Sequence, residues 1–224
     1  MRVYLASTSP ARLMVLRAAG IEPVVVPSQV DEDAVVRIAE QEHGKPLATT
    51  AIVQLLAQAK AEAILGQRPK GEPMSGIIIG GDSSLELDGE TLGKPHTAER
   101  ARARWQAQRG RTAILHSGHW VLHVKNGTVV GSRGATASAR VTFVGDMSDA
   151  EIDAYVGTGE PLEVAGAFTI DSLGAAYIAS IEGDPSTVIG VSVPTLRSLV
   201  TALGIEWPSL WNRPGLANAN TGSQ

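Results

Sequence analysis

The chain has 224 residues, of which 43% are hydrophobic and 19% are charged. This balance is typical of a globular protein and excludes an intrinsically disordered one. Its net charge of −4 argues against a general nucleic-acid binder, because affinity for nucleic acids comes mostly from cations that meet phosphates.

The protein is expected in the cytoplasm, without contact to a membrane. The absence of cysteine excludes disulfides and thiolate metal sites, as is common in the cytosol. No stretch reaches the ~20 apolar residues that a membrane helix needs. The N-terminal segment turns polar after Ala6, unlike a signal peptide.

The first predicted elements are a short strand at residues 2–6 and a helix that follows it. Ser9 has the side chain of an N-cap, Pro10 suits the first helical position and Gly20 is a natural stop. Residues 23–27 predict a second strand.

The central part of the chain predicts a helix and a buried strand. Residues 31–33 are acidic and suit a loop or a helix start. Apolar residues recur at helical spacing over 46–65, with Lys60 at the edge of the apolar stripe. Residues 77–79 are β-branched and predict a strand buried on both faces, with Asp82 at or just beyond its end.

Two dipeptides, Asp88-Gly89 and Asn126-Gly127, predict tight hairpin turns. Further elements are expected as helices at 97–108, after Ser148 in a capping box and at 194–203, and as strands at 137–144 and 175–181. Crossovers and hairpins together predict a mixed α/β fold with a mixed sheet. We expect one domain over residues 1–207 and a disordered tail over 208–224.

Ser7, Ser9 and Arg12 are candidates for a phosphate clamp. A helix start presents free N–H groups and a partial positive charge, to which two hydroxyls and a guanidinium would add donors. The alternative is a plain capped helix with a solvated arginine, and spacing alone favours that alternative.

Asp82 and Lys94 form a second candidate pair. The stretch between them nearly contains a phosphate loop, but the glycines are one residue too close and Pro95 stands where Ser or Thr is needed. A carboxylate at the end of a buried strand could bind a divalent metal or accept a proton from water. Lys94 could neutralise a phosphate. A turn residue and a surface charge are equally compatible with the sequence.

Three other groups are weaker candidates. The acidic stretches 31–33 and 182–184 could add a metal ligand but are typical of solvated loops. The histidines in segment 116–123 lie on a predicted strand, where residues four apart are ~13 Å from each other, too far for a zinc helix. The arginines of segment 100–111 surround their helix, which favours a solvated face over an RNA platform.

Five segments in series resemble the Maf family of nucleoside triphosphate pyrophosphatases, over nearly the whole chain up to about residue 204. They are LASTSPAR at 5–12, with one extra residue before the arginine, VDED at 30–33, LAQAKA at 56–61, GGDSSLELDGETLGKP at 80–95 and the block 159–184 that ends in Glu-Gly-Asp. Each motif is weak alone, whereas five in order are specific.

The resemblance implies an elongated mixed sheet with flanking helices and two lobes around a central cleft, similar to inosine-triphosphate pyrophosphatases. It implies a hydrolase of acid anhydrides that cleaves between the α and β phosphates of nucleoside triphosphates, and so removes non-canonical or surplus nucleotides. A divalent cation, Mg²⁺ or Mn²⁺, would be the cofactor.

The resemblance also implies roles for single residues. Asp82 would be the proton acceptor, and Glu32 the second carboxylate and metal ligand beside Asp82. The residues that would bind substrate are Ser7, Ser9, Arg12, Lys60, Ser83, Lys94 and Asp171.

Two departures from the family pattern bear on substrate choice. Ser83 replaces the usual threonine after the aspartate and keeps a hydroxyl. Asp171 replaces a glutamine of the pyrimidine-specific branch, and a carboxylate only accepts hydrogen bonds whereas an amide also donates. The preferred base therefore stays open. An alternative function also stays open, that of a nucleotide-binding regulator of cell division without useful catalysis. A homodimer is expected on frequency alone.

Overall fold

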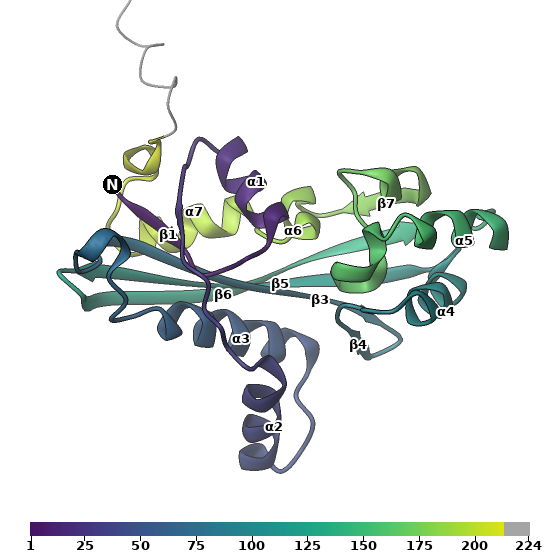
Figure 1. Cartoon of the computed structure of the whole chain (residues 1–224), viewed down its shortest axis with the longest axis horizontal. Helices are drawn as coiled ribbons and strands as arrows, with labels where there is room; N and C mark the ends of the chain where they lie inside the picture. Colours follow the sequence, from purple (N-terminus) through teal and green to yellow (C-terminus); the bar gives the residue numbers. More distant parts are fainter. Residues whose placement is uncertain (213–224) are drawn as a thin grey trace, which may run out of the picture.

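A long, mixed, seven-stranded β-sheet forms the body of the protein in the computed structural model, which describes residues 1–212 (Figure 1). The spatial order is β2-β1-β3-β5-β6-β7, and β4 pairs with the far part of β3. Strand β1 is parallel to both of its neighbours, and the other pairs are antiparallel. The strands are β1 (Val3–Leu5), β2 (Val24–Val25), β3 (Gly76–Leu87), β4 (Glu90–Leu92), β5 (Thr112–Lys125), β6 (Thr128–Phe143) and β7 (Ile178–Glu182).

Helices cover both faces of the sheet. Figure 1 shows α1 and α7 on one face, α3 on the other, and α4 and α5 at the far end. The α-helices are α1 (Pro10–Ala18), α2 (Glu32–His43), α3 (Thr49–Ala63), α4 (Ala98–Gln108), α5 (Asp149–Gly157), α6 (Pro185–Ile189) and α7 (Val193–Ala202). Short 3₁₀ turns, including Glu160–Glu163 and Leu173–Tyr177, connect some of them. The predicted mixed sheet with flanking helices is confirmed.

The hydrophobic core is divided between the two ends of the sheet, as expected for two lobes. Two clusters lie on opposite faces near β1, one beneath α1 and α7 and the other beside α3. A third cluster lies at the far end around Trp105, whose indole N–H donates to the carbonyl of Ala167 at 2.7 Å. The middle of β3 joins the two ends, and the candidate site lies there.

Local sequence signals place most elements correctly. The side chain of Ser9 accepts a hydrogen bond from the backbone N–H of Arg12, and Pro10 is the first helical residue. Ser148 forms the predicted capping box. Asp88 and Asn126 have φ angles of 55° and 49°, as the predicted two-residue hairpin turns require.

Three strand predictions were wrong in their bounds. Strand β3 continues to Leu87, so that Asp82 lies inside it, because the ladder with β5 runs unbroken past this residue. The strand predicted at 137–144 is the second half of β6, which starts at Thr128 and pairs with β5 along almost its whole length. Strand β7 begins at Ile178 because a 3₁₀ turn occupies the preceding residues.

The segment predicted as a tail begins with ordered residues. A 3₁₀ turn spans Trp207–Leu210, and Leu210 is buried against the cluster beneath α1 and α7. The rest of that prediction, residues 213–224, lies outside the described residues.

Helix α3 lies unusually close to the sheet because glycines face it. A Cβ atom added to Gly80 would lie 2.1 Å from the carbonyl oxygen of Ala57, and one added to Gly118 would lie 2.1 Å from that of Val53. Both glycines therefore let the backbone of α3 touch the strands. This close approach brings α3 within reach of the middle of β3.

We predict that Gly118→Ala destabilises the protein by about 2 kcal/mol or more, because the added methyl would displace the backbone of α3. Chemical denaturation of the variant and the parent measures the change. The control is Gly157→Ala at the end of α5, where an added Cβ meets nothing within 4 Å. Equal stability of both variants would contradict this account of the packing.

Candidate functional site

The candidate site lies at an interruption in the pairing of one edge of β3. Strand β1 pairs with β3 as far as Ile79, and β4 pairs with it again from Leu85. Among the described residues, no strand pairs with this edge in between. Side chains alternate between the two faces of a strand. Asp82 therefore shares the α3 face with Gly80, and Ser83 shares the α1 face with Gly81.

On the α3 face, Lys60 binds two carboxylates. Its Nζ lies 2.7 Å from an oxygen of Asp82 and 2.7 Å from an oxygen of Glu32. The side chains of Lys60 and Asp82 are only 9% and 10% exposed. A buried ammonium is stabilised only when anions surround it. The three residues therefore form one interdependent charge cluster.

Three different elements bring this cluster together. Asp31 caps α2 by accepting the N–H of Ala34, which places Glu32 at the first helical position. Lys60 comes from the last turn of α3, which the sheet glycines hold close. Lys60 is buried rather than at the edge of the apolar stripe, because its ammonium reaches the carboxylates.

On the α1 face, Arg12 is fixed by three hydrogen bonds. Its Nε donates to the carbonyl of Gly190 at 3.1 Å, Nη1 to the hydroxyl of Ser7 at 3.2 Å and Nη2 to the hydroxyl of Ser83 at 3.2 Å. Burial lowers the pKa of Arg12, whereas Asp82 and Glu32 oppose that shift. A guanidinium has five N–H groups. The three bonds leave one N–H group on each terminal nitrogen, and a guanidinium of this shape can bind two phosphate oxygens.

The predicted helix-start clamp is assembled in part around Arg12. Ser7 accepts from the Arg12 side chain and from the backbone N–H of Ser9. The hydroxyl of Ser9 serves as the N-cap. The arginine is not solvated, so the plain-helix alternative does not describe its side chain.

Two predicted substrate residues lie apart from these contacts. Lys94 follows β4, is 52% exposed, and its Nζ lies 3.9 Å from Glu163. Asp171 is exposed on the connection between two 3₁₀ turns. It lies in the far lobe, the part of the protein around the core cluster of Trp105. The structure neither pairs them with Asp82 nor tests their roles.

The motif Glu-Gly-Asp has a structural role at Asp184. Its carboxylate accepts hydrogen bonds from the N–H and hydroxyl of Ser186 and from the hydroxyl of Thr187. These bonds cap the short helix α6, after which Gly190 supplies the carbonyl for Arg12. Sequence reasoning missed Gly190, because a contact that joins residues 178 positions apart leaves no local signal.

The fit of a divalent cation can be judged from the carboxylates. Among residues 1–212, no three His, Asp or Glu side chains are grouped so as to hold a metal ion. Asp82 and Glu32 nevertheless converge on one cation, the ammonium of Lys60. Mg²⁺ needs only one or two carboxylates when phosphates and water fill its other positions. The pair therefore fits a cation that arrives with a phosphate substrate.

His119 is a buried structural residue on β5. Its Nδ1 lies 3.2 Å from the carbonyl oxygen of Ala135, and its Nε2 accepts the N–H of Ser192 at 2.8 Å. Burial, assisted by the charge of Arg12, lowers its pKa to about 4. A neutral ring that donates at Nδ1 and accepts at Nε2 satisfies both neighbours.

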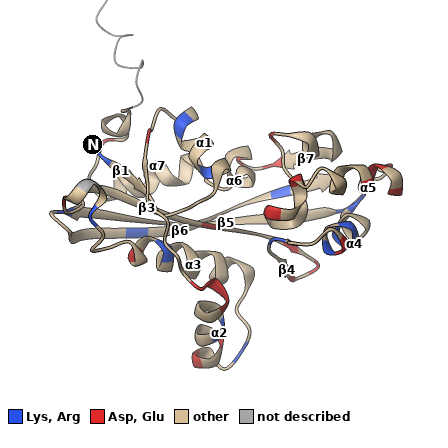
Figure 2. Ribbon diagram, in the orientation of Figure 1, with Lys and Arg blue, Asp and Glu red and all other residues tan. Residues whose placement is uncertain are grey.

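Several arginines of segment 100–111 form ion pairs, whereas Arg104 donates to the carbonyl of Gly93. Figure 2 shows α4 beside the acidic residues of α5. Arg102 pairs with Asp149 and Asp153, and Arg109 pairs with Asp149. This arrangement favours the solvated face over an RNA platform.

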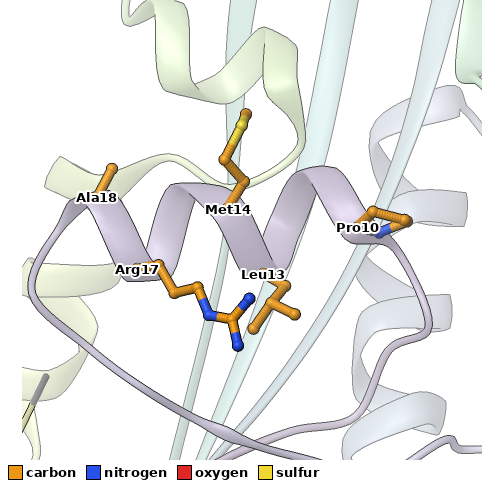
Figure 3. Close-up of a pocket in the computed structure, with 5 residues that line it drawn as sticks. All are labelled: Pro10, Leu13, Met14, Arg17 and Ala18. Atoms are coloured by element: carbon orange, nitrogen blue, oxygen red, sulfur yellow. The ribbon is translucent and has the colours of Figure 1, made fainter.

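A surface hollow of about 340 Å³ lies on α1, lined by Pro10, Leu13, Met14, Arg17 and Ala18 (Figure 3). None of these residues belongs to the predicted site.

Within the described residues, no helix is long and apolar enough to cross a bilayer.

We predict that stability falls as pH drops from about 6.5 towards 4, because His119 must stay neutral in the folded state whereas it takes up a proton in the unfolded one. The contribution that is lost approaches about 3 kcal/mol. Urea denaturation across this range measures it. His119→Leu should be less stable at pH 7 but should lack this component of the slope, and a slope equal to that of the parent would contradict the assignment. His43→Gln, at an exposed position, is the control.

Comparisons with known proteins agree on one family. A family model described as "Maf-like protein" matches residues 2–203. A nucleoside triphosphate pyrophosphatase of Leifsonia xyli is 63% identical over 217 residues, covering 97% of this chain and 100% of that protein. Proteins with the same name from Rhodococcus jostii and Corynebacterium efficiens are 46% and 45% identical, covering 94% and 95% of this chain and 96% and 100% of their own lengths.

Two solved structures are more distantly similar. The Staphylococcus aureus Ham1 protein is 12% identical with a TM-score of 0.38, covering 66% of this chain and 74% of that one. A nucleoside-triphosphatase, or dITP/XTP pyrophosphatase, from Mycobacterium abscessus is 11% identical with a TM-score of 0.35, covering 91% and 94%.

Proposed function

The chain belongs to the Maf-like protein family, and from that premise we propose that it hydrolyses nucleoside triphosphates to a monophosphate and pyrophosphate. The observation that carries the proposal is the buried pair of Asp82 and Lys60, joined by the half-exposed Glu32, beside the guanidinium of Arg12. The names of the similar proteins support the same reaction. Removal of non-canonical or surplus nucleotides in the cytoplasm would be its purpose.

The cationic groups bind and neutralise the triphosphate. Arg12 presents two N–H groups to phosphate oxygens, and its other three are held by the protein. The side chain is therefore already ordered and loses little conformational freedom when it binds phosphate. Lys60 approaches from the opposite face of β3. Cleavage of a phosphoanhydride depends chiefly on such positioning and charge neutralisation, so that no covalent nucleophile is required.

Asp82 accepts the proton of the attacking water. One of its carboxylate oxygens binds Lys60, so the other can face the open edge of β3. Glu32 holds Lys60 from the other side and shares the charge of the cluster. A divalent cation, Mg²⁺ or Mn²⁺, would be held by Asp82 and Glu32, where it would lower the pKa of bound water and offset phosphate charge.

Lys94 and Asp171 would act from the far lobe. An exposed pair such as Lys94 and Glu163 is worth little energy, so a phosphate could compete for the lysine. Asp171 would read the base as an acceptor of hydrogen bonds.

A panel of canonical and modified nucleoside triphosphates with Mg²⁺ tests the reaction. We expect pyrophosphate and the matching monophosphate in equal amounts, because the water attacks the α phosphorus. Release of orthophosphate would place the cleavage elsewhere. The ranking of bases would show which contacts the far lobe makes.

Asp82→Asn should lower turnover by a factor of ~10² or more, because the amide no longer accepts a proton from water. Binding of a non-hydrolysable triphosphate, measured by calorimetry, should persist. Asp33→Asn, an exposed neighbour of Glu32 on α2, is the matched control and should retain parental turnover.

A nucleotide-binding regulator without catalysis is the rival interpretation. It requires that nucleotides bind, that no product forms with Mg²⁺, Mn²⁺ or Co²⁺, and that any cellular effect survives Asp82→Asn. Full activity of purified Asp82→Asn would instead assign the proton transfer to another group.

A further inference from the structure

A chain of hydroxyls runs from Arg12 into the interior of the sheet. The hydroxyl of Ser83 lies 3.2 Å from Nη2 of Arg12 and 2.8 Å from the hydroxyl of Ser117. Ser117 lies on β5 directly opposite Ser83 and is completely buried. Its hydroxyl donates to the carbonyl of Thr187 on α6 at 2.8 Å.

The directions of these hydrogen bonds are fixed by their two ends. A guanidinium only donates, so Ser83 accepts from Arg12. A carbonyl only accepts, so Ser117 gives its single proton to Thr187. The bond between the two hydroxyls must then be donated by Ser83, whose own proton is thereby committed to Ser117.

We infer that Ser117 is a positioning residue for the phosphate fork of Arg12, acting through Ser83. The inference rests on the proposed function, because it explains how the same site would bind a triphosphate tightly. Ser117 holds the proton of Ser83 away from Arg12 and so keeps a lone pair of Ser83 aimed at Nη2. This bond fixes the plane of the guanidinium, and with it the direction of the two N–H groups of Arg12 that face the substrate.

Helix α6 supports Arg12 by two routes. Thr187, inside the helix, holds Ser117, and Gly190, just beyond its end, accepts directly from Nε of Arg12. Ser83 acts on the substrate through Arg12 and does not donate a hydrogen bond to the substrate, because its single proton is already donated to Ser117. A phosphate, which offers acceptors, gains nothing from a hydroxyl in this state.

Ser117→Ala removes the acceptor for the Ser83 proton. We expect the KM for the best triphosphate and the Kd for Mg²⁺–pyrophosphate to rise about tenfold, because Ser83 no longer holds Arg12 in the orientation that binds phosphate. The kcat should change by less than about threefold, because Arg12 holds ground state and transition state alike. Calorimetry with pyrophosphate and steady-state kinetics give the two readouts.

A double-mutant cycle separates positioning from general stability. If Ser117 acts through Ser83, Ser83→Ala and the double variant should show the same rise in KM, whereas independent effects would multiply. Thr136→Val is the matched control, since its hydroxyl also joins the sheet to a helix, bonding to Thr50 and Gln54, without contact to Arg12. Ser117→Cys, close in volume, replaces Ser117→Ala if the latter does not fold.

The outcomes distinguish this inference from the proposed function. Parental KM and Kd in folded Ser117→Ala, with an active parent, would overturn the positioning role alone. A fall in kcat at unchanged KM, or the same rise in Thr136→Val, would also overturn it. A parent protein that neither hydrolyses triphosphates nor binds pyrophosphate would overturn both.

Discussion

The buried ammonium of Lys60 is the interaction on which the candidate site depends. An ammonium that is 9% exposed needs anions around it, and it finds them on two elements far apart in the sequence, β3 and α2. Its reach to Asp82 depends in turn on α3 touching the sheet, which only residues without a Cβ at positions 80 and 118 permit. A packing constraint in the sheet thus decides where a charge can be placed.

The second constraint is the break in pairing along β3. A strand with partners on both edges would present its two faces to two separate environments. Because β1 stops at Ile79 and β4 begins opposite Leu85, groups from opposite faces can meet around the edge. Asp82 and Glu32, on the α3 side, oppose the lowering of the pKa of Arg12 that burial causes on the α1 side. Side chains from helices α1 and α3 therefore contact the adjacent residues Asp82 and Ser83 of β3.

The sequence predicts well those features whose cause is local. The cap at Ser9, the turn at Asn126 and the capping box at Ser148 each follow from a few neighbouring residues. The resemblance of five motifs to one family indicated Asp82, Glu32 and Lys60 together, and the structure brings them into contact. The parts that could not be predicted depend on pairing between distant segments. Neither the continuation of β3 past Asp82 nor the support of Arg12 by Gly190 has a local signal. The catalytic and substrate roles of all the predicted site residues, Lys94 and Asp171 among them, stay predictions.

Helix α2, which carries Glu32, is stabilised by few contacts with the rest of the protein. None of its residues, all of which the structure describes, is buried, and Figure 1 shows the helix projecting away from the sheet. Few apolar contacts mean a low free energy of local opening. The carboxylate of Glu32 can therefore leave and rejoin the cluster while the core stays folded. In hydrogen exchange, the amides of α2 would lose their protons well before those of β3 and β5, and a bound substrate that draws Glu32 inwards would slow that loss.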